Sequence, residues 1–533
     1  MSRRAAPKAN PAVRSTEGTP VSRFAYLGHY ARLTPDKVAV INATTGASIT
    51  YRELDERSTR LANHLRERGL RRGDHIALLM DNNIRAVEVV WAALRSGLWV
   101  TPVSRYLTPE EAVYILDDCD ARVVVSCHAM HALASAVTGR LPRCEQLLMA
   151  DGMVPGWDSY EEAIAGASAQ RPAQEWLGST MMYSSGTTGR PKGVLRTMDE
   201  RLVSEGPDPG RASTMTRFGF DADTVCLTMA PIYHAAALGN VINPQFCGGT
   251  AIFAERFDAQ EALRLIERYR VTHSQWVPTM FIRMLKLEPA VRARYDLSSM
   301  RVAIHAAAPC PVDVKRQMIE WWGPIIGEYY GGTELCGLTA IDSHEALERP
   351  GSVGKAILGR LRICDDAGDE VPTGVDGTVY FERDRVPFHY HKDPVRTRAT
   401  QNPRHPTWTA IGDIGHVDAD GYLYLTDRKD FMIISGGVNI YPQAIEDALA
   451  LHPRVEDVAV IGVPDADMGE SVKAIVEPAP GTPASAELAA ELIAFLRGRV
   501  ARVMVPRSVD FIDRMPRLPT GKLSKRLLRD RYR

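Results

Sequence analysis

The strongest constraint on the fold is an alternation of helical and strand patterns between residues 50 and 125. Residues 50–53 and 108–111 both have the Thr-x-x-Glu form of a helix-capping box, and the second has proline at the first helical position. Strand-like runs follow at residues 76–80 and 122–126. Helices that alternate with buried strands indicate an α/β fold of parallel sheets covered by helices.

The length of 533 residues exceeds one ordinary core, because a single domain typically holds about 100–200 residues. Residues 351–380, which are rich in Gly, Asp and short Val/Ile runs, predict a smaller β-rich part. A charged cluster at Arg428, Lys429 and Asp430 is the strongest candidate for a domain boundary.

The segment after this cluster has the elements of a small α+β domain. It contains strand-like residues 458–463 and 472–476, a surface loop at residues 477–485 and a helical pattern at residues 486–502. We therefore predict a large N-terminal domain of helix-covered sheets with a small β-rich part, and a small α+β C-terminal domain. The predicted limits are a disordered tail at residues 1–20, the N-terminal domain at residues 21–428 and the C-terminal domain at residues 429–533.

The composition excludes several classes of protein. Hydrophobic residues make up 45% and charged residues 24%, which is typical of globular proteins and not of disordered or fibrous ones. The 64 basic and 65 acidic side chains leave a formal net charge of −1, so bulk charge gives no attraction to nucleic acid or anionic membranes. No long apolar run predicts a transmembrane helix, and the basic N-terminus lacks the apolar segment of a secretory signal.

The 8 cysteines form no C-x-x-C pair, and none follows Cys364. This spacing makes a zinc cluster or a disulfide framework an unfavourable interpretation. Scattered cysteines among small or apolar residues indicate reduced thiols, so we expect a cytoplasmic protein.

A string rich in glycine, hydroxyl and basic side chains occupies residues 184–193. Glycines let backbone N–H groups turn toward an anion, and hydroxyls and cations add the donors that a polyphosphate requires. The string is not a Walker A loop, because Pro191 stands five residues after Gly186. A polar loop after a strand, without function, is the alternative. The residues assigned to phosphate binding are Ser184, Ser185, Gly186, Thr187, Thr188, Gly189 and Lys192.

This string resembles the phosphate-binding signature of the acyl-adenylate-forming (AMP-binding) superfamily. That superfamily includes acyl-CoA synthetases, aryl-acid CoA ligases, peptide-synthetase adenylation domains and beetle luciferases. The resemblance continues in the family's order from about residue 24 to residue 526, which is nearly the whole chain. It implies ATP and Mg²⁺ as cofactors, a carboxylic acid as substrate, coenzyme A as co-substrate and a mobile C-terminal domain.

Residues 328–334 are similar to the family's aromatic-Gly-x-Thr-Glu segment. A tyrosine ring can stack on adenine, and glycines permit close approach of a ligand. The resemblance assigns Thr333 to the α-phosphate and Glu334 to Mg²⁺, which prefers oxygen ligands. Residues 305–309 resemble the small-residue strand end beside adenine, although a packed Ala-rich strand is the alternative. The nucleotide-binding residues assigned here are Ala307, Ala308, Glu328, Tyr329, Tyr330, Gly331 and Thr333.

The next similar segment contains Asp413 and continues to Arg428. By resemblance, the Asp413 carboxylate accepts hydrogen bonds from both ribose hydroxyls and Arg428 reaches the same ribose. Ile411 stands where the family usually has threonine, which leaves the carboxylate in place. Asp430 falls at the family's hinge position, and Gly436 and Gly437 are expected to face coenzyme A.

Residues 519–523 resemble the string that carries the family's catalytic lysine, which assigns that role to Lys522. Its ammonium can contact the substrate carboxylate and the α-phosphate together. The alternative is that Lys522 belongs to a solvated cluster with Arg517, Lys525, Arg526 and Arg529.

Residues 231–237 resemble the segment that lines the acyl pocket in CoA ligases. His234 matches a histidine beside the acyl carboxyl end and is the second assigned catalytic residue, although a structural histidine is the alternative. No acidic residue lies between Pro231 and Gln245, which argues against an amino-acid substrate. The residues assigned to the acyl pocket are Tyr233, His234, Ala306, Gly331 and Gly332.

The run of small side chains at residues 235–237, with Gly331 and Gly332, suggests a roomy apolar pocket. Such a pocket favours a fatty or similarly hydrophobic acid, with aryl and steroid acids as alternatives. An acyl-AMP ligase without CoA activity and a luciferase-like oxygenase use the same adenylation residues. A protein that had lost catalysis would show loss at Lys522, Glu334 or Asp413, and all three are present. We expect small-molecule partners and no nucleic acid, and a homodimer is compatible with the sequence.

Overall fold

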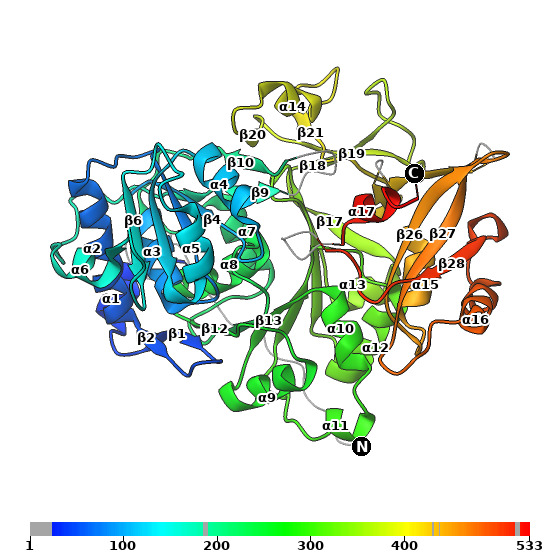
Figure 1. Ribbon diagram of the computed structural model, residues 1–533, viewed down its shortest axis with the longest axis horizontal. Coiled ribbons are helices and arrows are strands. Elements are labelled where there is room, and N and C mark those ends of the chain that lie inside the picture. The colour runs from blue at the N-terminus through cyan, green and yellow to red at the C-terminus, as the bar shows by residue number, and fades with distance from the viewer. Residues whose placement is uncertain (1–23, 185–189, 429–430, 436–437, 518–522, 533) are drawn as a thin grey trace.

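The computed structural model describes residues 24–184, 190–428, 431–435, 438–517 and 523–532 (Figure 1). A six-stranded parallel sheet is formed by strands between residues 75 and 180, in the order β7-β6-β5-β3-β4-β8. Its strands are β3 (His75–Leu79), β4 (Trp99–Pro102), β5 (Ala121–Cys127), β6 (Gln146–Ala150), β7 (Asp158–Ser159) and β8 (Ser179–Thr180).

Helices connect these strands, as the sequence predicts. Thr50 and Thr108 form complete capping boxes with Glu53 and Glu111, and these begin α2 (Tyr51–Glu67) and α4 (Pro109–Asp118). The α/β fold class is therefore confirmed for this part of the chain. The other helices around this sheet are α1 (Leu27–Leu33), α3 (Ile84–Leu94), α5 (His131–Val137) and α6 (Tyr160–Ala165).

A 14-stranded sheet crosses the middle of the molecule. One half is mainly parallel and runs β15-β14-β13-β11-β12-β1, and the other half is antiparallel. The predicted β-rich part at residues 351–380 lies in the antiparallel half. The strands are β1 (Val38–Asn42), β2 (Ser48–Thr50), β11 (Val225–Thr228), β12 (Thr250–Phe253), β13 (His273–Trp276), β14 (Val302–His305), β15 (Ile326–Tyr330), β16 (Leu338–Ile341), β17 (Ser352–Leu358), β18 (Arg360–Cys364), β19 (Gly377–Glu382), β21 (Trp408–Thr409), β22 (Asp413–Val417) and β23 (Leu423–Arg428).

A three-stranded sheet joins these two sheets and has the order β20-β10-β9. Its strands are β9 (Met182–Ser184), β10 (Lys192–Arg196) and β20 (Phe388–Tyr390). The helices that accompany the large sheet are α7 (Pro209–Arg217), α8 (Ala235–Ile242), α9 (Ala259–Tyr269), α10 (Pro278–Leu285), α11 (Pro289–Arg292), α12 (Val312–Trp322), α13 (Ser343–Glu348) and α14 (Pro394–Ala399).

The last part of the chain forms a five-stranded sheet with its own hydrophobic core, drawn orange to red in Figure 1. This separate α+β unit confirms the predicted small C-terminal domain, whereas its mobility and the limits at residues 20 and 428 stay predictions. Its elements are β24 (Ile433–Ser435), β25 (Val438–Ile440), β26 (Val455–Asp465), β27 (Gly469–Pro478), β28 (Ser508–Phe511), α15 (Gln443–Ala450), α16 (Ala486–Leu496) and α17 (Lys525–Arg529).

Two sequence-based limits in this domain are wrong. The helix expected at residues 486–502 ends at Leu496, because Arg497 is extended (φ −62°, ψ 125°) and Gly498 has φ +82°. The loop expected from residue 477 begins two residues later, because β27 continues to Pro478 as the partner of β26.

The small domain meets the rest of the chain through apolar packing of Ala450 and Leu451 against the core beneath the large sheet, and through a few polar contacts. Lys286 Nζ donates to the Val455 carbonyl over 2.6 Å, and Arg283 forms an ion pair with Glu456 at 3.4 Å. The Gln443 backbone N–H also donates to the Asp427 carboxylate over 3.3 Å. None of the helices in the described residues has the length and apolarity needed to cross a membrane.

A buried cation joins the helices that cover the six-stranded sheet. The Arg95 side chain is 1% exposed and forms ion pairs with Asp55 at 2.9 Å and Glu175 at 2.6 Å. It also donates to the hydroxyls of Ser58 and Thr59 on α2. Because every charged partner has a hydrogen bond, this arrangement satisfies groups whose burial would otherwise be costly.

We expect Arg95→Ala to destabilise the N-terminal part of the protein by about 3–5 kcal/mol, because Glu175 would keep a buried charge without its partner. Arg52→Ala is the matched control, since the Arg52–Asp36 pair is exposed (60% and 85%). Removing such a pair is expected to cost less than about 1 kcal/mol. Urea unfolding followed by circular dichroism measures both changes, and equal shifts in the two variants would contradict the role of Arg95.

Candidate active site

The assigned residues gather where the large sheet changes direction. Strand β15 pairs in parallel with β14 and antiparallel with β16, so β15 is the switch point of the sheet. The segments after His305 and Tyr330 leave the sheet at the carboxyl ends of β14 and β15. Ligands of open α/β sheets bind outside the carboxyl ends of their strands.

Tyr329 and Tyr330 point to opposite faces of β15, as successive residues of a strand do. The Tyr330 hydroxyl donates to Asp413 Oδ2 over 2.6 Å, and its ring stacks on Phe381 with centroids 6.3 Å apart. Burial, together with the Asp413 charge, raises the pKa of this hydroxyl well above its usual value, so it remains a donor. Tyr329 is half-buried and lies beside Phe218 on the other face.

Asp413 and Arg428 are partners across strands β22 and β23. Arg428 Nε donates to Asp413 Oδ1 over 3.0 Å, and Asp413 is 6% exposed. One oxygen of the Asp413 carboxylate therefore accepts a hydrogen bond from Arg428, and the other accepts one from Tyr330. The structure brings together the two segments that the resemblance assigned to adenine and ribose.

Glu334 connects this region to the phosphate-binding string. The Tyr390 hydroxyl donates to Glu334 Oε1 over 2.9 Å, and Lys192 Nζ lies 5.1 Å from the centre of the Tyr390 ring. Burial and the Glu334 charge raise the pKa of Tyr390, which keeps this hydroxyl protonated. Lys192 faces Ser184 across strands β10 and β9, so the string forms a hairpin. Residues 185–189, which include Ser185, Gly186, Thr187, Thr188 and Gly189, lie outside the described residues.

The donor set around Glu334 fits Mg²⁺. Its carboxylate is 7% exposed, and Tyr390 occupies one of its two oxygens. Mg²⁺ is usually bound by one or two protein carboxylates together with substrate phosphates and water. Glu334 beside the phosphate-binding hairpin supplies such a carboxylate.

The glycines at residues 331 and 332 are required by packing within the protein. A Cβ atom on Gly331 would lie 2.5 Å from Leu338 Cδ2, and one on Gly332 would lie 2.6 Å from Ile411 Cδ1. We inferred open space in the acyl pocket from these two glycines. That inference is wrong, because the side chains of Leu338 and Ile411 fill the space beside them. Ile411 packs at Gly332, and this contact brings residues 331–334 next to Asp413. Thr333 lies half-buried between Gly332 and Glu334.

The end of β14 has a strained backbone. Ala306 is buried, whereas Ala307 and Ala308 are exposed, and Ala307 has φ +76°. A positive φ is uncommon for a residue other than glycine and often occurs at ligand sites. The turn at Ala307 directs this segment out of the sheet at the carboxyl end of β14.

Glu328 corrects one expectation from the sequence. It faces His305 across β14 and β15, it is buried, and its carboxylate bonds to Lys315 on α12. Its side chain therefore points away from Tyr329 and is not available to a nucleotide. His305 is fully buried beside it, and burial lowers the pKa of its imidazole to about 4, so this ring is neutral at pH 7.

The acyl-pocket segment lies at the start of α8. Tyr233 is buried, His234 is the N-cap residue, and their rings lie 4.6 Å apart. Ala235, Ala236 and Gly239 form a face of small residues, and a Cβ atom on Gly239 would meet nothing within 4 Å. This face provides the open apolar space that the glycines at 331 and 332 do not provide.

Four assigned residues, Lys522, Asp430, Gly436 and Gly437, lie outside the described residues. Strands β24 and β25 pair on either side of Gly436 and Gly437. Lys525, which follows Lys522 on α17, forms an ion pair with Glu446 at 2.8 Å.

Sequence reasoning missed the residues that support the assigned ones. Tyr390, Phe381 and Lys315 each contact an assigned side chain, and none stands in a recognisable motif. Only the alternation of a strand could have shown that Glu328 faces away from Tyr329.

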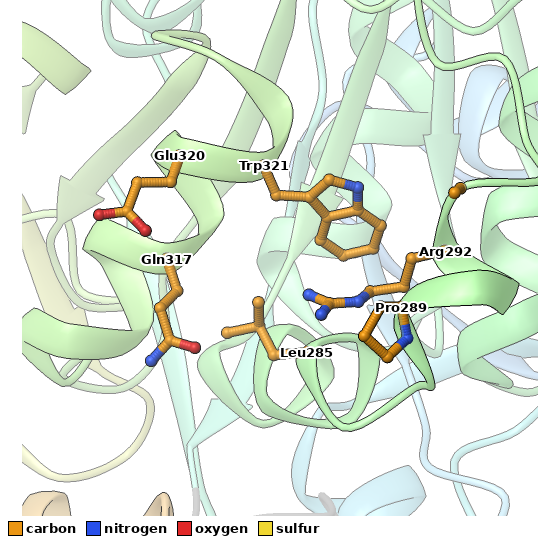
Figure 2. Close-up of a pocket in the computed structure, with 7 residues that line it drawn as sticks. Leu285, Pro289, Arg292, Gln317, Glu320 and Trp321 are labelled. Atoms are coloured by element: carbon orange, nitrogen blue, oxygen red, sulfur yellow. The ribbon is translucent and has the colours of Figure 1, made fainter.

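Two cavities among the described residues differ in their relation to the assigned residues. The larger, about 500 Å³, lies between α10, α11 and α12, where Figure 2 shows Trp321 and Arg292 facing one another. It contains none of the assigned residues. The second, about 280 Å³, includes Lys192 and lies beside the phosphate-binding hairpin.

Comparisons with known proteins agree with this arrangement. The family model described as AMP-binding enzyme matches residues 27–390, and the model for the AMP-binding enzyme C-terminal domain matches residues 444–522. A feruloyl-CoA synthase of Amycolatopsis sp is 35% identical over 509 residues, covering 94% of this chain and 97% of that protein. A long-chain-fatty-acid–CoA ligase of Mycobacterium tuberculosis is 32% identical over 515 residues, with 94% and 97% covered.

A solved structure shows the same fold. The anthranilate CoA ligase AuaEII in complex with anthranoyl-AMP superposes with a TM-score of 0.81 at 25% identity, covering 96% of this chain and 98% of that chain. The sequence-based identification as an acid–thiol ligase of the acyl-adenylate-forming type is thereby confirmed. The chain belongs to the AMP-binding enzyme family.

Proposed function

We propose that this protein activates a hydrophobic carboxylic acid with ATP and transfers the acyl group to coenzyme A. The observation that carries the proposal is the convergence of Tyr330, Asp413 and Glu334 with the phosphate-binding hairpin at the switch point. CoA ligases among the relatives support coenzyme A as the acceptor.

In the first half-reaction, a carboxylate oxygen attacks the α-phosphorus of ATP, and the bond to the pyrophosphate oxygen breaks. The products are an acyl-adenylate and pyrophosphate. Asp413 and Arg428 would hold the ribose, while Lys192, the hydroxyls of residues 184–188 and Lys522 would stabilise negative charge. Glu334 would hold Mg²⁺, which when bound neutralises phosphate charge.

In the second half-reaction, the thiol of coenzyme A loses its proton and attacks the acyl carbonyl carbon. The bond from this carbon to the phosphate oxygen breaks, giving a thioester and AMP. Rotation of the C-terminal domain about Asp430 would bring Gly436 and Gly437 toward the site, where glycine lets the pantetheine arm approach the backbone.

The substrate class rests on the surface of α8. The small residues Ala235, Ala236 and Gly239 leave apolar space near His234, which suits a fatty or similarly bulky acid. An aryl acid is the second candidate, because the Tyr233 ring packs near the Tyr106 ring (6.5 Å) and offers a flat wall. Relatives named for ferulic and long-chain fatty acids are compatible with both classes.

Pyrophosphate release tests this proposal directly. With ATP and Mg²⁺, a panel of fatty, aryl, steroid and amino acids is expected to give release with one acid class, and multiple turnovers only with coenzyme A. Lys522→Ala is expected to lower adenylate formation by about 10²–10³-fold, as for loss of one charge-stabilising group.

Arg526→Ala is the matched control, because Arg526 is an exposed cation on the next helix. It should change the rate by no more than about two-fold. Equal activity of Lys522→Ala and the parent would contradict the catalytic role, and release without dependence on coenzyme A would favour an acyl-AMP ligase.

ATP binding tests the ribose site. Asp413→Asn is expected to weaken ATP binding by about 10–100-fold, because a charged acceptor is lost. Tyr330→Phe keeps the ring, the Asp413 carboxylate and its bond to Arg428, so ATP binding should weaken less than in Asp413→Asn. Calorimetry measures both affinities, and weaker binding in Tyr330→Phe alone would contradict the assignment of Asp413 to ribose.

A further inference from the structure

The cavity of about 280 Å³ beside the phosphate-binding hairpin has a cationic lining. Arg190 and Lys192 come from the hairpin, Lys392 follows β20, and Arg396 is on α14. Only two carboxylates, Asp118 and Asp393, oppose these four cations in the lining. The cavity is therefore suited to a multiply charged anion.

The two carboxylates are already engaged. The Tyr183 hydroxyl donates to Asp118 Oδ2 over 2.5 Å, and Asp393 caps α14 by accepting from the Arg396 backbone N–H over 2.9 Å. The Arg396 guanidinium is 3.8 Å from Asp393. Arg190 has no carboxylate partner among the described residues, and its guanidinium lies 5.0 Å from the centre of the Tyr114 ring.

The remaining lining groups do not cancel this positive charge. Lys392 Nζ bonds to Asp120 Oδ1 at 2.9 Å, but Asp120 also pairs with Arg143. Burial and the nearby Lys392 charge lower the pKa of His391, so its ring is neutral at pH 7.

The walls of the cavity are fixed to the strand that carries Lys192. The Tyr114 hydroxyl donates to the Pro191 carbonyl over 3.1 Å, and the His391 backbone N–H donates to the Gly193 carbonyl over 2.8 Å. Helix α4, strand β10 and the end of β20 thus form a built site, continuous with the hairpin that follows Ser184.

We infer that this cavity binds the diphosphate of inorganic pyrophosphate after it leaves ATP. Adenylation breaks the bond between the α-phosphorus and the bridging oxygen, so a small trianion must depart while the acyl-adenylate remains bound. A cationic cavity next to the hairpin gives this anion a binding site that shares only Lys192 with the residues assigned to ATP. The inference rests on the proposed adenylation reaction.

Coenzyme A also contains a diphosphate group. The diphosphate that this cavity fits therefore has two candidate sources, inorganic pyrophosphate and coenzyme A. Pyrophosphate is favoured because the cavity begins at Arg190, within the phosphate-binding string itself. A site for the leaving group needs this proximity, whereas the diphosphate of coenzyme A is separated from the reacting thiol by the length of the pantetheine arm.

The test compares two arginines of the same short helix. Arg396 lines the cavity, whereas Arg398 is exposed and does not. With full-length protein and sodium pyrophosphate, Arg396→Ala is expected to weaken calorimetric binding by about ten-fold, as for loss of a charge-assisted hydrogen bond. Arg398→Ala should change it by less than about two-fold, because exposed charges act weakly at distance.

ATP and coenzyme A form the other arms of the experiment. Arg396→Ala should leave ATP and coenzyme A affinities within about two-fold of the parent. Arg190→Ala is a second variant that should weaken pyrophosphate binding in the same direction, and thermal unfolding confirms that each variant is folded. Pyrophosphate should also become a weaker product inhibitor of AMP formation in both variants.

Three results would overturn the inference. Equal weakening of ATP and pyrophosphate would make the cavity part of the ATP site, and weakening of coenzyme A alone would assign it to the other diphosphate. Unchanged pyrophosphate binding in both variants would remove the site altogether. Because calorimetry needs no turnover, failure of this inference is distinguishable from failure of the proposed reaction.

Discussion

The buried carboxylate of Asp413 is the interaction on which the arrangement of the site depends. Tyr330 at the end of β15 and Arg428 at the end of β23 each bind one of its oxygens. A carboxylate that is 6% exposed requires such partners, because an unpaired buried charge is strongly unfavourable. This requirement holds the antiparallel half of the large sheet against the switch strand and so places together the residues that the resemblance assigned to adenine and ribose.

The face of β15 that carries Tyr330 also contains a second buried charge pair, Glu328 with Lys315. Two residues of one face therefore serve different purposes, since Glu328 anchors the strand to α12 while Tyr330 bonds to Asp413. The neutral, fully buried His305 adds a polar ring to this packing without adding charge. A site at the end of two strands fixed in this way gains rigidity from the core beneath it.

Short sequence patterns predicted the helices and strands and the order of the site residues along the chain. Contacts between residues far apart in the sequence set the geometry of the site. The capping boxes at Thr50 and Thr108 were readable because all their atoms lie within four residues. The bond from Tyr390 to Glu334 spans 56 residues, and no pattern near either residue indicates it. The end of α16 was missed because the apolar pattern of the sequence continues past Leu496. The helical backbone does not continue, since Gly498 has φ +82°.

The short passage between β23 and β24 has a thermodynamic consequence. Arg428, the last residue of β23, bonds to Asp413, and β24 of the small domain begins at Ile433. Any reorientation of that domain would act first on a residue of the ribose site. Thermodynamic linkage is reciprocal. If the orientation of the small domain changes the free energy of nucleotide binding, nucleotide binding changes the free energy of domain orientation by the same amount. Ligand and domain orientation would thus be coupled through this backbone connection as well as through the side-chain contacts between the two parts.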